Sequence, residues 1–465
     1  MSDQDKSWLP TLHDVAGPKY RAIAAALAEA VADGRLRPGD RLPPHRDLAR
    51  RLGVDLTTVT RAYGEARRMG LVEAGGRRGS FVRAGPAPGI EPRDAEPPAV
   101  DLTMNMPPQP AGLAPRLAAG YAALLAAPGA GLRLAYQASI GAAPDRAAGA
   151  VLLAGRIPGT TTGEVAVAAG GQSALAAVLP LLAAAGDLVA AAPVAYPGFL
   201  ALARRAGVGV VPVAADAGGL DPDAFAAACR RQPIRALYVV PTNDNPTTAT
   251  LDEPRRRALA AVAARHGVAI LEDDAYGLLA RAAPPPIAAF AAERTWHVAS
   301  VSKALTPALR VAFVRCPTAA DAHRLGEGLH AGCVMAPPLN AALVARLLGD
   351  GGFAALVAAV RQEAAGRQRL AAEILGDGRF AAHPDGYHLW LPLPGGVDPV
   401  GLAAAVARAG LPVVAAEAFA VDAAARPPAA VRVSLGGPMS RDRLRDGLVA
   451  LAARLDAGRP GSALV

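Results

Sequence analysis

The sequence predicts an α/β protein that carries a small helical domain at its N-terminus. The chain has 465 residues, which is more than one ordinary domain holds and favours two or three domains. From about residue 100 onward, apolar strands such as residues 236–240 and 268–271 alternate with helical stretches, which is typical of a mostly parallel sheet. Before that point, charged and apolar positions alternate at helical spacing.

Residues 1–83 divide into three predicted helices and a hairpin. An apolar stripe at helical spacing predicts the first helix: Tyr20, Ile23, Leu27 and Val31. A short second helix ends at Gly53, and a third covers about residues 56–69. Residues 71–73 and 80–82 flank a basic, glycine-rich tip, which predicts a β-hairpin. Three helices followed by a hairpin make a winged helix-turn-helix.

Much of the positive charge of the chain lies in this first domain. Residues 1–83 hold 15 lysines and arginines against 10 aspartates and glutamates, so that +5 of the net charge of +8 falls in less than a fifth of the chain. A basic excess confined to one end indicates a nucleic-acid partner. The third helix would enter the major groove, and the second helix and the hairpin tip would reach bases or backbone. We expect six side chains to contact DNA: Arg46, Thr57, Thr58, Arg61, Arg77 and Arg78.

The order and spacing of residues 34–43, 46–49 and 57–63 resemble the GntR family of regulators. The resemblance covers nearly all of the first domain and implies that it binds double-stranded DNA at a promoter or operator. The competing interpretation is a helical interaction module whose charges only face the solvent.

The composition changes after the predicted hairpin. Residues 84–99, AGPAPGIEPRDAEPPA, are rich in proline and glycine without periodicity and predict a semi-rigid linker. This linker separates the first domain, residues 1–83, from a large domain at residues 100–465. Within the large domain we expect a smaller C-terminal subdomain from about residue 345.

Several classes of protein are excluded by what the chain lacks. Cys229, Cys316 and Cys333 match no metal-ligand or redox spacing, which indicates reduced thiols and no metal site. The N-terminal ten residues are acidic and have no apolar core of a signal peptide. The apolar run at residues 174–203 contains Asp187 and three prolines, which argues against a membrane span. We therefore expect a soluble, cytoplasmic protein.

One segment predicts a cofactor. Residues 300–310, SVSKALTPALR, place Lys303 after two serines and seven residues before Arg310. This arrangement suits a cofactor that carries both an aldehyde and a phosphate. The lysine amine can form a Schiff base with the aldehyde, and the hydroxyls and the guanidinium can hold the phosphate.

Four further segments, taken singly, each have an ordinary structural explanation. A glycine pair at residues 170–171 opens a helix and offers backbone N–H groups to a phosphate. Tyr196 lies between an apolar strand and a Pro-Gly turn, and Asn245 lies in an Asn-Pro turn. Asp273 ends a buried strand, where a carboxylate is costly to leave unpaired and could keep a pyridine nitrogen protonated.

Taken together and in this order, the five segments resemble the fold-type I pyridoxal-phosphate aminotransferases over roughly residues 100–450. The resemblance implies pyridoxal 5′-phosphate as the cofactor, with Lys303 as the catalytic residue that holds it. It assigns the other contacts as follows: the phosphate to Gly171, Gln172, Ser300, Ser302 and Arg310, the ring face to Tyr196, the phenolate to Asn245 and Tyr276, and the pyridine nitrogen to Asp273.

Three more features extend this resemblance. Tyr136 looks like the tyrosine that reaches a phosphate in the neighbouring subunit, which implies a homodimer with shared sites. Arg432, in the alternating segment 431–435, sits where aminotransferases hold the α-carboxylate of the substrate. A surface arginine on an edge strand is the alternative for Arg432. Residues 101–108 look like the strand that leads into the large domain in some members of the family.

A GntR-like winged helix joined to an aminotransferase-like domain is the layout of the MocR subfamily of regulators. This resemblance covers essentially the whole chain and implies a DNA-binding transcriptional regulator that binds pyridoxal phosphate and senses it, or an amine or amino acid effector. An active aminotransferase with a regulatory DNA-binding domain is the alternative. Fusion to a DNA-binding domain favours sensing, because a regulator needs its ligand to change its shape rather than to release product. A degenerate domain that serves only dimerisation is disfavoured, because Lys303, Asp273, Asn245 and Arg310 are all present.

Overall fold

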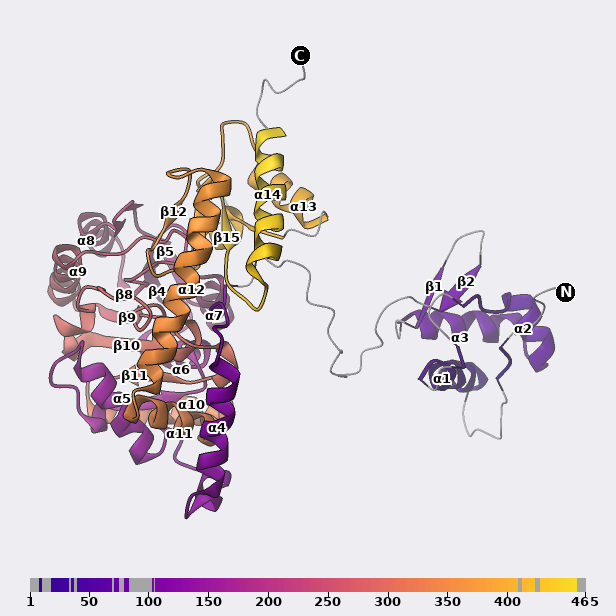
Figure 1. Ribbon diagram of the computed structural model, residues 1–465, viewed down its shortest axis with the longest axis horizontal. Helices are drawn as coiled ribbons and strands as arrows, with labels where there is room; N and C mark the ends of the chain where they lie inside the picture. Colours follow the sequence, from indigo (N-terminus) through magenta and orange to yellow (C-terminus); the bar gives the residue numbers. More distant parts are fainter. Residues whose placement is uncertain are drawn as a thin grey trace. The chain divides into compact units, whose positions relative to one another are not determined.

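The computed structural model describes residues 8–10, 18–32, 35–36, 40–68, 71–74, 79–82, 103, 105–408, 412–422 and 427–457. These residues belong to two units, Met1–Glu96 and Pro97–Val465, and each unit is described by itself (Figure 1). The predicted linker at residues 84–99 and the predicted DNA contacts Arg77 and Arg78 lie outside the described residues.

The first unit contains three helices and a hairpin. Their bounds are α1 Lys19–Ala32, α2 His45–Leu52, α3 Leu56–Arg68, β1 Val72–Ala74 and β2 Ser80–Val82. The strands pair antiparallel, with Val72 opposite Val82. Helix α2 ends at Gly53, whose φ of 60° is left-handed and favours glycine. The apolar stripe of α1 packs on buried residues of α2 and α3, notably Leu48 and Tyr63. The prediction of a helix-turn-helix domain followed by a hairpin is confirmed.

The second unit is built on a seven-stranded sheet of order β3-β11-β10-β9-β8-β4-β5. The strands are β3 Val165–Ala168, β4 Leu188–Ala191, β5 Gly209–Pro212, β8 Ile234–Val239, β9 Ala269–Asp273, β10 Thr295–Ser300 and β11 Ala312–Arg315. Only the two pairs that involve β11 are antiparallel among the pairs of this sheet. The predicted mostly parallel sheet is therefore confirmed.

Helices cover both faces of this sheet. They are α4 Leu113–Ala126, α5 Ala143–Ala154, α6 Gly171–Leu182, α7 Pro197–Ala206, α8 Pro222–Arg231, α9 Glu253–His266, α10 Ala319–Cys333 and α11 Pro338–Gly349. Alternate residues of β8 point to opposite faces, as a strand requires. Ala236 and Tyr238 belong to the core shared with α6 and α7, whereas Leu237 and Val239 belong to the core under α8 and α9. A two-stranded hairpin, β6 Ala215–Asp216 and β7 Gly219–Leu220, lies between β5 and α8 in the chain.

A smaller α+β part follows helix α12, Gly352–Leu375. Its four-stranded sheet has the order β12-β13-β15-β14 and is antiparallel throughout. Its elements are β12 Ala381–Ala382, β13 His388–Pro392, α13 Pro399–Arg408, β14 Val414–Ala415, β15 Ala430–Ser434 and α14 Arg441–Ala457. Helix α12, orange in Figure 1, packs against α11 near one end and α14 near the other.

Two expectations from the sequence concern segments outside these sheets. The strand expected at residues 101–108 is wrong for the residues that are described there: Thr103 and residues 105–108 form no strand. Pro107 and Pro108 lack the N–H that a strand ladder needs. Among the described helices, none by itself has the length and apolar character to cross a membrane; α11 and α12 pass that test only as a pair, with a bend of 89° between them.

Candidate functional site

A cavity opens at the carboxyl ends of the central strands, where open α/β sheets place their ligands. All the predicted cofactor-binding residues except Tyr136 line it. The lining residues are Gly171, Gln172, Leu175, Tyr196, Val240, Asn245, Asp273, Ala275, Tyr276, Ser300, Ser302, Lys303, Pro307 and Arg310. Five segments that are far apart in the sequence are thus brought to one place. Four of them end a strand or begin a helix at this edge of the sheet, and the fifth, with Asn245, is the turn that follows β8.

One wall of the cavity has the groups that hold an anion. Helix α6 begins at Gly171, directly after Gly170, whose φ of 84° is left-handed. A Cβ on Gly170 would lie 3.0 Å from Cζ of Arg310, so the guanidinium sits against this turn, and its Nη2 donates to the carbonyl of Ala169 over 3.0 Å. The hydroxyl of Ser302 is buried and has no partner within the part of the chain that the structure describes. This wall therefore combines a cation, a helix N-terminus and a free hydroxyl.

Gln172 and Ser300 stand in the same wall. The Gln172 side chain donates to the carbonyl of Gly198 over 3.0 Å, while its oxygen is buried without a partner among the described residues. The hydroxyl of Ser300 accepts from the backbone N–H of Ser302 at 3.2 Å and so begins the short turn Val301–Lys303. Both residues thus shape the turn and helix start that line the cavity.

Lys303 carries the reactive amine of the site. Burial, together with the charge of Arg432, lowers the pKa of this amine to about 8, although Asp273 raises it. The amine donates to the backbone carbonyl of Asn105. A lysine whose pKa lies near neutrality offers an unprotonated nucleophile, which a surface lysine does not.

Asp273 lies buried at the end of β9. Burial raises the pKa of its carboxyl to about 6, while a hydrogen bond from Tyr238 and the charge of Lys303 act in the opposite direction. The hydroxyl of Tyr238 donates to Oδ2 of Asp273 over 2.9 Å, and the Tyr238 ring stacks on Phe199 with ring centroids 3.7 Å apart. Tyr238 was not predicted to be a site residue, because a tyrosine within an apolar strand resembles an ordinary core residue.

Arg432 reaches the cavity through Asn245. Its Nη1 donates to Oδ1 of Asn245 over 2.9 Å, and its Nη2 donates to the carbonyl of Thr103. Arg432 is 6% exposed, and its strand β15 lies between β13 and β14. The alternative of a surface arginine on an edge strand is therefore wrong. Since Arg432 occupies the oxygen of the Asn245 amide, the amide nitrogen is left to face a ligand.

Asn105 is a site residue that the sequence did not select. Its side-chain nitrogen donates to the hydroxyl of Tyr276 over 2.6 Å, and its backbone carbonyl accepts from Lys303. Burial raises the pKa of the Tyr276 hydroxyl well above its usual range, so that it stays protonated. The only signal in the sequence was the position of Asn105 in the segment expected to be a strand.

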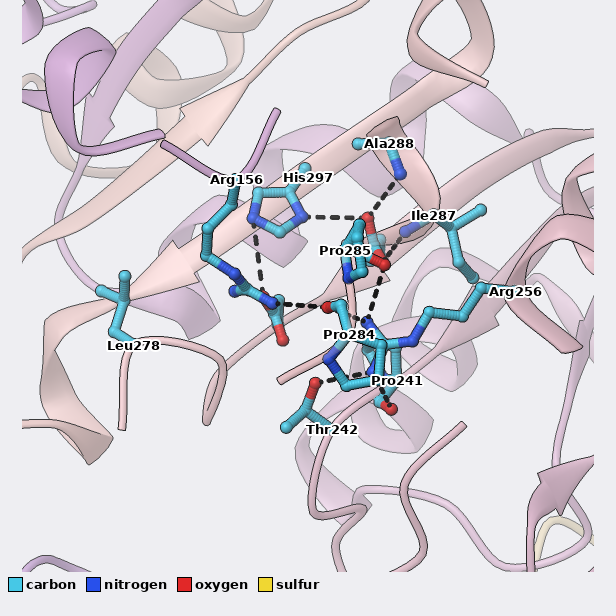
Figure 2. A network of polar contacts seen from close by, with 12 residues as sticks. Arg156, Pro241, Thr242, Arg256, Leu278, Pro284, Pro285, Ile287, Ala288 and His297 are labelled. Carbon is cyan, nitrogen blue, oxygen red and sulfur yellow. Dashed lines mark hydrogen bonds and ion pairs between the residues drawn. The ribbon is translucent and has the colours of Figure 1, made fainter. Parts of the chain in front are cut away.

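A buried polar network lies next to two segments that line the cavity (Figure 2). Asp274, which the sequence left without a task, pairs with Arg156. His297 lies 2.9 Å from Oε2 of Glu272, and Glu272 also accepts from two backbone N–H groups. Arg256 donates to the carbonyl of Pro241 over 2.8 Å and to the hydroxyl of Thr242 over 3.0 Å. These contacts fix the end of β9, which carries Asp273, and the turn that leads to Asn245.

Tyr136 stands apart from the cavity of its own chain. Its side chain is 85% exposed. The homodimer in which Tyr136 would reach the neighbouring subunit therefore stays a prediction.

The predicted DNA-contacting residues of the first unit occupy the surface of α2 and α3. Arg46, Thr57 and Arg61 are exposed, and Thr58 is half-buried. Asp55 caps the start of α3, because its carboxylate accepts from both the N–H and the hydroxyl of Thr57. The guanidinium of Arg61 lies 4.5 Å from the ring centroid of Tyr20, which supports the long side chain.

Comparisons with known proteins agree with this arrangement. The chain matches the family described as aminotransferase class I and II over residues 98–451, and the family described as bacterial regulatory proteins, gntR family, over residues 19–82. It is 29% identical to the uncharacterized HTH-type transcriptional regulator YdeF of Bacillus subtilis, with 97% of each chain covered. It is 30% identical to the vitamin B6 salvage pathway transcriptional repressor PtsJ of Salmonella typhimurium, with 88% of this chain and 92% of the relative covered.

The second unit, which contains the cavity, is also similar to a solved structure. LysN, an α-aminoadipate aminotransferase of Thermus thermophilus complexed with N-(5′-phosphopyridoxyl)-L-leucine, is 26% identical and superposes with a TM-score of 0.69. The match covers 77% of this chain and 92% of LysN.

Proposed function

We propose that this chain, which belongs to the aminotransferase class I and II family and, with its gntR-type N-terminal domain, to the MocR subfamily of regulators, is a transcriptional regulator that binds pyridoxal 5′-phosphate. Its first unit would bind double-stranded DNA through Arg46, Thr57, Thr58, Arg61, Arg77 and Arg78. Its second unit would sense the cofactor, or an amine or amino acid that joins it. The same fold can carry different functions, so the function has to be argued from the residues of the cavity.

The observation that carries the proposal is the donor set of the cavity. An amine with a lowered pKa, a buried carboxyl and an anion-holding wall line one space. The oxygen atoms of Ser302 and Gln172 find no partner among the residues that the structure describes, which supports a ligand at this wall. Lys303 is also the only one of the chain's three lysines that lies beyond residue 96, the others being Lys6 and Lys19.

These residues fit pyridoxal 5′-phosphate. Bound in this cavity, the cofactor would supply an aldehyde that condenses with amines and a ring that withdraws electrons. Lys303 would hold the aldehyde. Gly171, Gln172, Ser300, Ser302 and Arg310 would hold the phosphate. Tyr196, Asn245, Asp273 and Tyr276 would hold the ring, and Tyr238 would keep the Asp273 carboxylate oriented by its hydrogen bond.

The effector would be a small amine, and Arg432 supports one with a carboxylate. A buried guanidinium beside the cavity is suited to bidentate binding of a carboxylate. The name of PtsJ connects that relative with vitamin B6, which supports the cofactor itself as a second candidate signal. Tyr136 supports a homodimer, because an exposed tyrosine of this segment would serve the neighbouring subunit.

The test is to map where the cofactor binds and whether the chain turns substrate over. The purified protein is loaded with pyridoxal phosphate, reduced with borohydride and digested, and the expected result is a phosphopyridoxyl group on Lys303 and on neither Lys6 nor Lys19. Lys303→Ala should lose the visible absorption band on dialysis while it keeps its circular dichroism.

A second measurement separates a sensor from an enzyme. Amino donors and keto acids are added to the loaded protein, and both the absorption and the keto-acid product are followed. The proposal expects a change in absorption with little release of product. Sustained turnover would replace it with the alternative of an active aminotransferase.

A further inference from the structure

The segment that follows the predicted linker crosses the candidate ligand site. We call its described residues, Thr103 and residues 105–107, the strap. The carbonyl of Thr103 accepts from Arg432, and the carbonyl of Asn105 accepts from the amine of Lys303. The strap therefore uses the same two positive groups that the proposed function gives to a carboxylate and an aldehyde.

Asn105 fastens the strap to the floor of the cavity. Its side-chain nitrogen donates to the hydroxyl of Tyr276 over 2.6 Å, across 171 positions of the sequence. Its side-chain oxygen is buried and finds no partner in the described part of the chain. The strap thus contacts three residues of the site, Tyr276, Lys303 and Arg432.

The other end of the strap is anchored to the loop after β15. The N–H of Gly437 lies 3.1 Å from the carbonyl of Met106 and 3.3 Å from that of Pro107. A Cβ on Gly436 would come within 1.7 Å of the Met106 carbonyl oxygen, so this close approach requires glycine. Strand β15 carries Arg432, and the loop directly after it carries Gly436 and Gly437. Both ends of the strap are therefore held by one short stretch of chain.

A ligand carboxylate and the strap compete for hydrogen bonds from the guanidinium of Arg432. Nη1 donates to Asn245 and Nη2 donates to Thr103, and a bidentate carboxylate that also binds Nη2 competes with the Thr103 carbonyl at that nitrogen. A carboxylate carries a negative charge and can accept two parallel N–H bonds from the guanidinium, whereas the carbonyl of Thr103 is neutral and accepts one bond from Nη2. The carboxylate therefore displaces the carbonyl, and not the reverse.

We infer that the strap is an internal competitor of the effector, which a carboxylate displaces from Arg432. Displacement breaks the contact between Arg432 and the Thr103 carbonyl, while Gly437 keeps the Met106 end in place. Because Thr103 follows the predicted linker by a few residues in the sequence, occupancy of Arg432 would act on the segment that leads toward the DNA-binding unit. The inference rests on the proposed function, since it takes Lys303 and Arg432 as ligand-binding groups.

Only molecules with an open strap can bind a carboxylate at Arg432. The apparent affinity for carboxylate ligands is therefore the intrinsic affinity multiplied by the fraction of molecules in which the strap is open. Asn105→Ala removes the hydrogen bond to Tyr276 and should open the strap about fivefold more often, as expected for one ordinary hydrogen bond. Gly436→Ala should also open the strap more often, because its Cβ would push against the carbonyl of Met106. Gln109→Ala, an exposed position just beyond the strap, is the matched control.

The experiment compares two probes on the full-length protein by calorimetry. N-(5′-phosphopyridoxyl)glycine carries the carboxylate of every α-amino acid, pyridoxamine 5′-phosphate lacks it, and neither has to react with Lys303. The quantity measured is the ratio of their two dissociation constants. We expect this ratio to favour the carboxylate probe about fivefold more in Asn105→Ala and Gly436→Ala than in the wild type and in Gln109→Ala. A general loss of packing would weaken both probes and leave the ratio unchanged.

The possible results distinguish a failure of the strap inference from a failure of the proposed function. If neither probe binds the wild type, or if Arg432→Gln leaves the ratio as it was, the proposed ligand site is wrong. If the wild type prefers the carboxylate probe and Arg432→Gln abolishes this preference, but Asn105→Ala does not raise it, the strap is not a competitor. Should Gly436→Ala fail to fold, Asn105→Ala against Gln109→Ala decides the question.

Discussion

Arg432 donates a hydrogen bond from Nη1 to the side-chain oxygen of Asn245 over 2.9 Å, across 187 positions of the sequence. This contact joins the residue proposed for the effector carboxylate to the residue proposed for the cofactor ring. It also fixes the direction of the Asn245 amide, whose nitrogen is left for a ligand acceptor. The two proposed functions of the site are therefore coupled through one amide.

The coupling predicts different outcomes for two substitutions of Asn245. Asn245→Asp should pair with Arg432 as a buried ion pair, and so weaken binding of N-(5′-phosphopyridoxyl)glycine by about tenfold or more. Asn245→Ala removes the ring contact but leaves Arg432 available, so the preference for this probe over pyridoxamine phosphate should persist. Equal preferences in the two variants, measured by calorimetry, would show that the amide does not couple the two sites.

The lowered pKa of Lys303 predicts how cofactor uptake depends on pH. Because burial lowers the pKa to about 8, the amine is protonated below that pH and free above it. The rate of pyridoxal phosphate uptake should rise about tenfold per pH unit up to about pH 8 and then level off. Asp273 raises this pKa, so Asp273→Asn should move the midpoint to lower pH, whereas the exposed Asp377→Asn should not. Uptake that keeps rising to pH 10 would contradict the lowered pKa.

The surface of α2 and α3 predicts a salt-dependent reader of DNA. Arg46→Ala and Arg61→Ala should each weaken binding by about 5- to 150-fold if they contact a base edge, which corresponds to about 1–3 kcal/mol. A phosphate contact would instead weaken all sequences alike and reduce the salt dependence by about one ion. The measurement uses DNA that the full-length protein selects from a random library, with the exposed Arg324→Ala of the second unit as the control. Unaltered affinity in both variants would favour the interaction-module alternative.

The network behind the cavity predicts a large effect on stability. Arg156→Ala would leave the fully buried carboxylate of Asp274 without its paired charge, which costs about 3–5 kcal/mol of the free energy of unfolding. Arg324→Ala breaks the exposed pair with Asp321 and should cost less than about 1 kcal/mol. Urea denaturation of the two variants checks this difference, and similar losses in both would mean that Asp274 is protonated or otherwise compensated.

The sequence predicted the fold and most of the cavity because these features are local. Asp273 ends a strand, Lys303 and Asn245 each follow one within a few residues, and the sheet brings such positions to the same edge. The strand that carries Arg432 could be predicted from its alternation, and the role of Arg432 from the resemblance to aminotransferases. Its burial and its bond to Asn245 could not, because they depend on the neighbours of β15 in the sheet.

The residues that were missed act over long distances in the sequence. Asn105 joins Lys303 and Tyr276 from a segment without regular structure, and no periodicity marks such a position. Tyr238 resembled an ordinary core residue, because only the folded sheet shows that its hydroxyl meets Asp273. Asp274 had no visible purpose until Arg156, 118 positions earlier, was found beside it.

The central claim is that a ligand on Lys303 changes how the chain binds DNA. The most direct test measures the affinity of the full-length protein for its selected DNA with and without pyridoxal phosphate, in the wild type and in Lys303→Ala. The account predicts that the cofactor, alone or with an added amino acid, shifts the affinity of the wild type about fivefold or more, in line with a coupling free energy of about 1–3 kcal/mol. Lys303→Ala should bind the same DNA without responding. DNA binding of the wild type that is identical with and without these ligands would contradict the account.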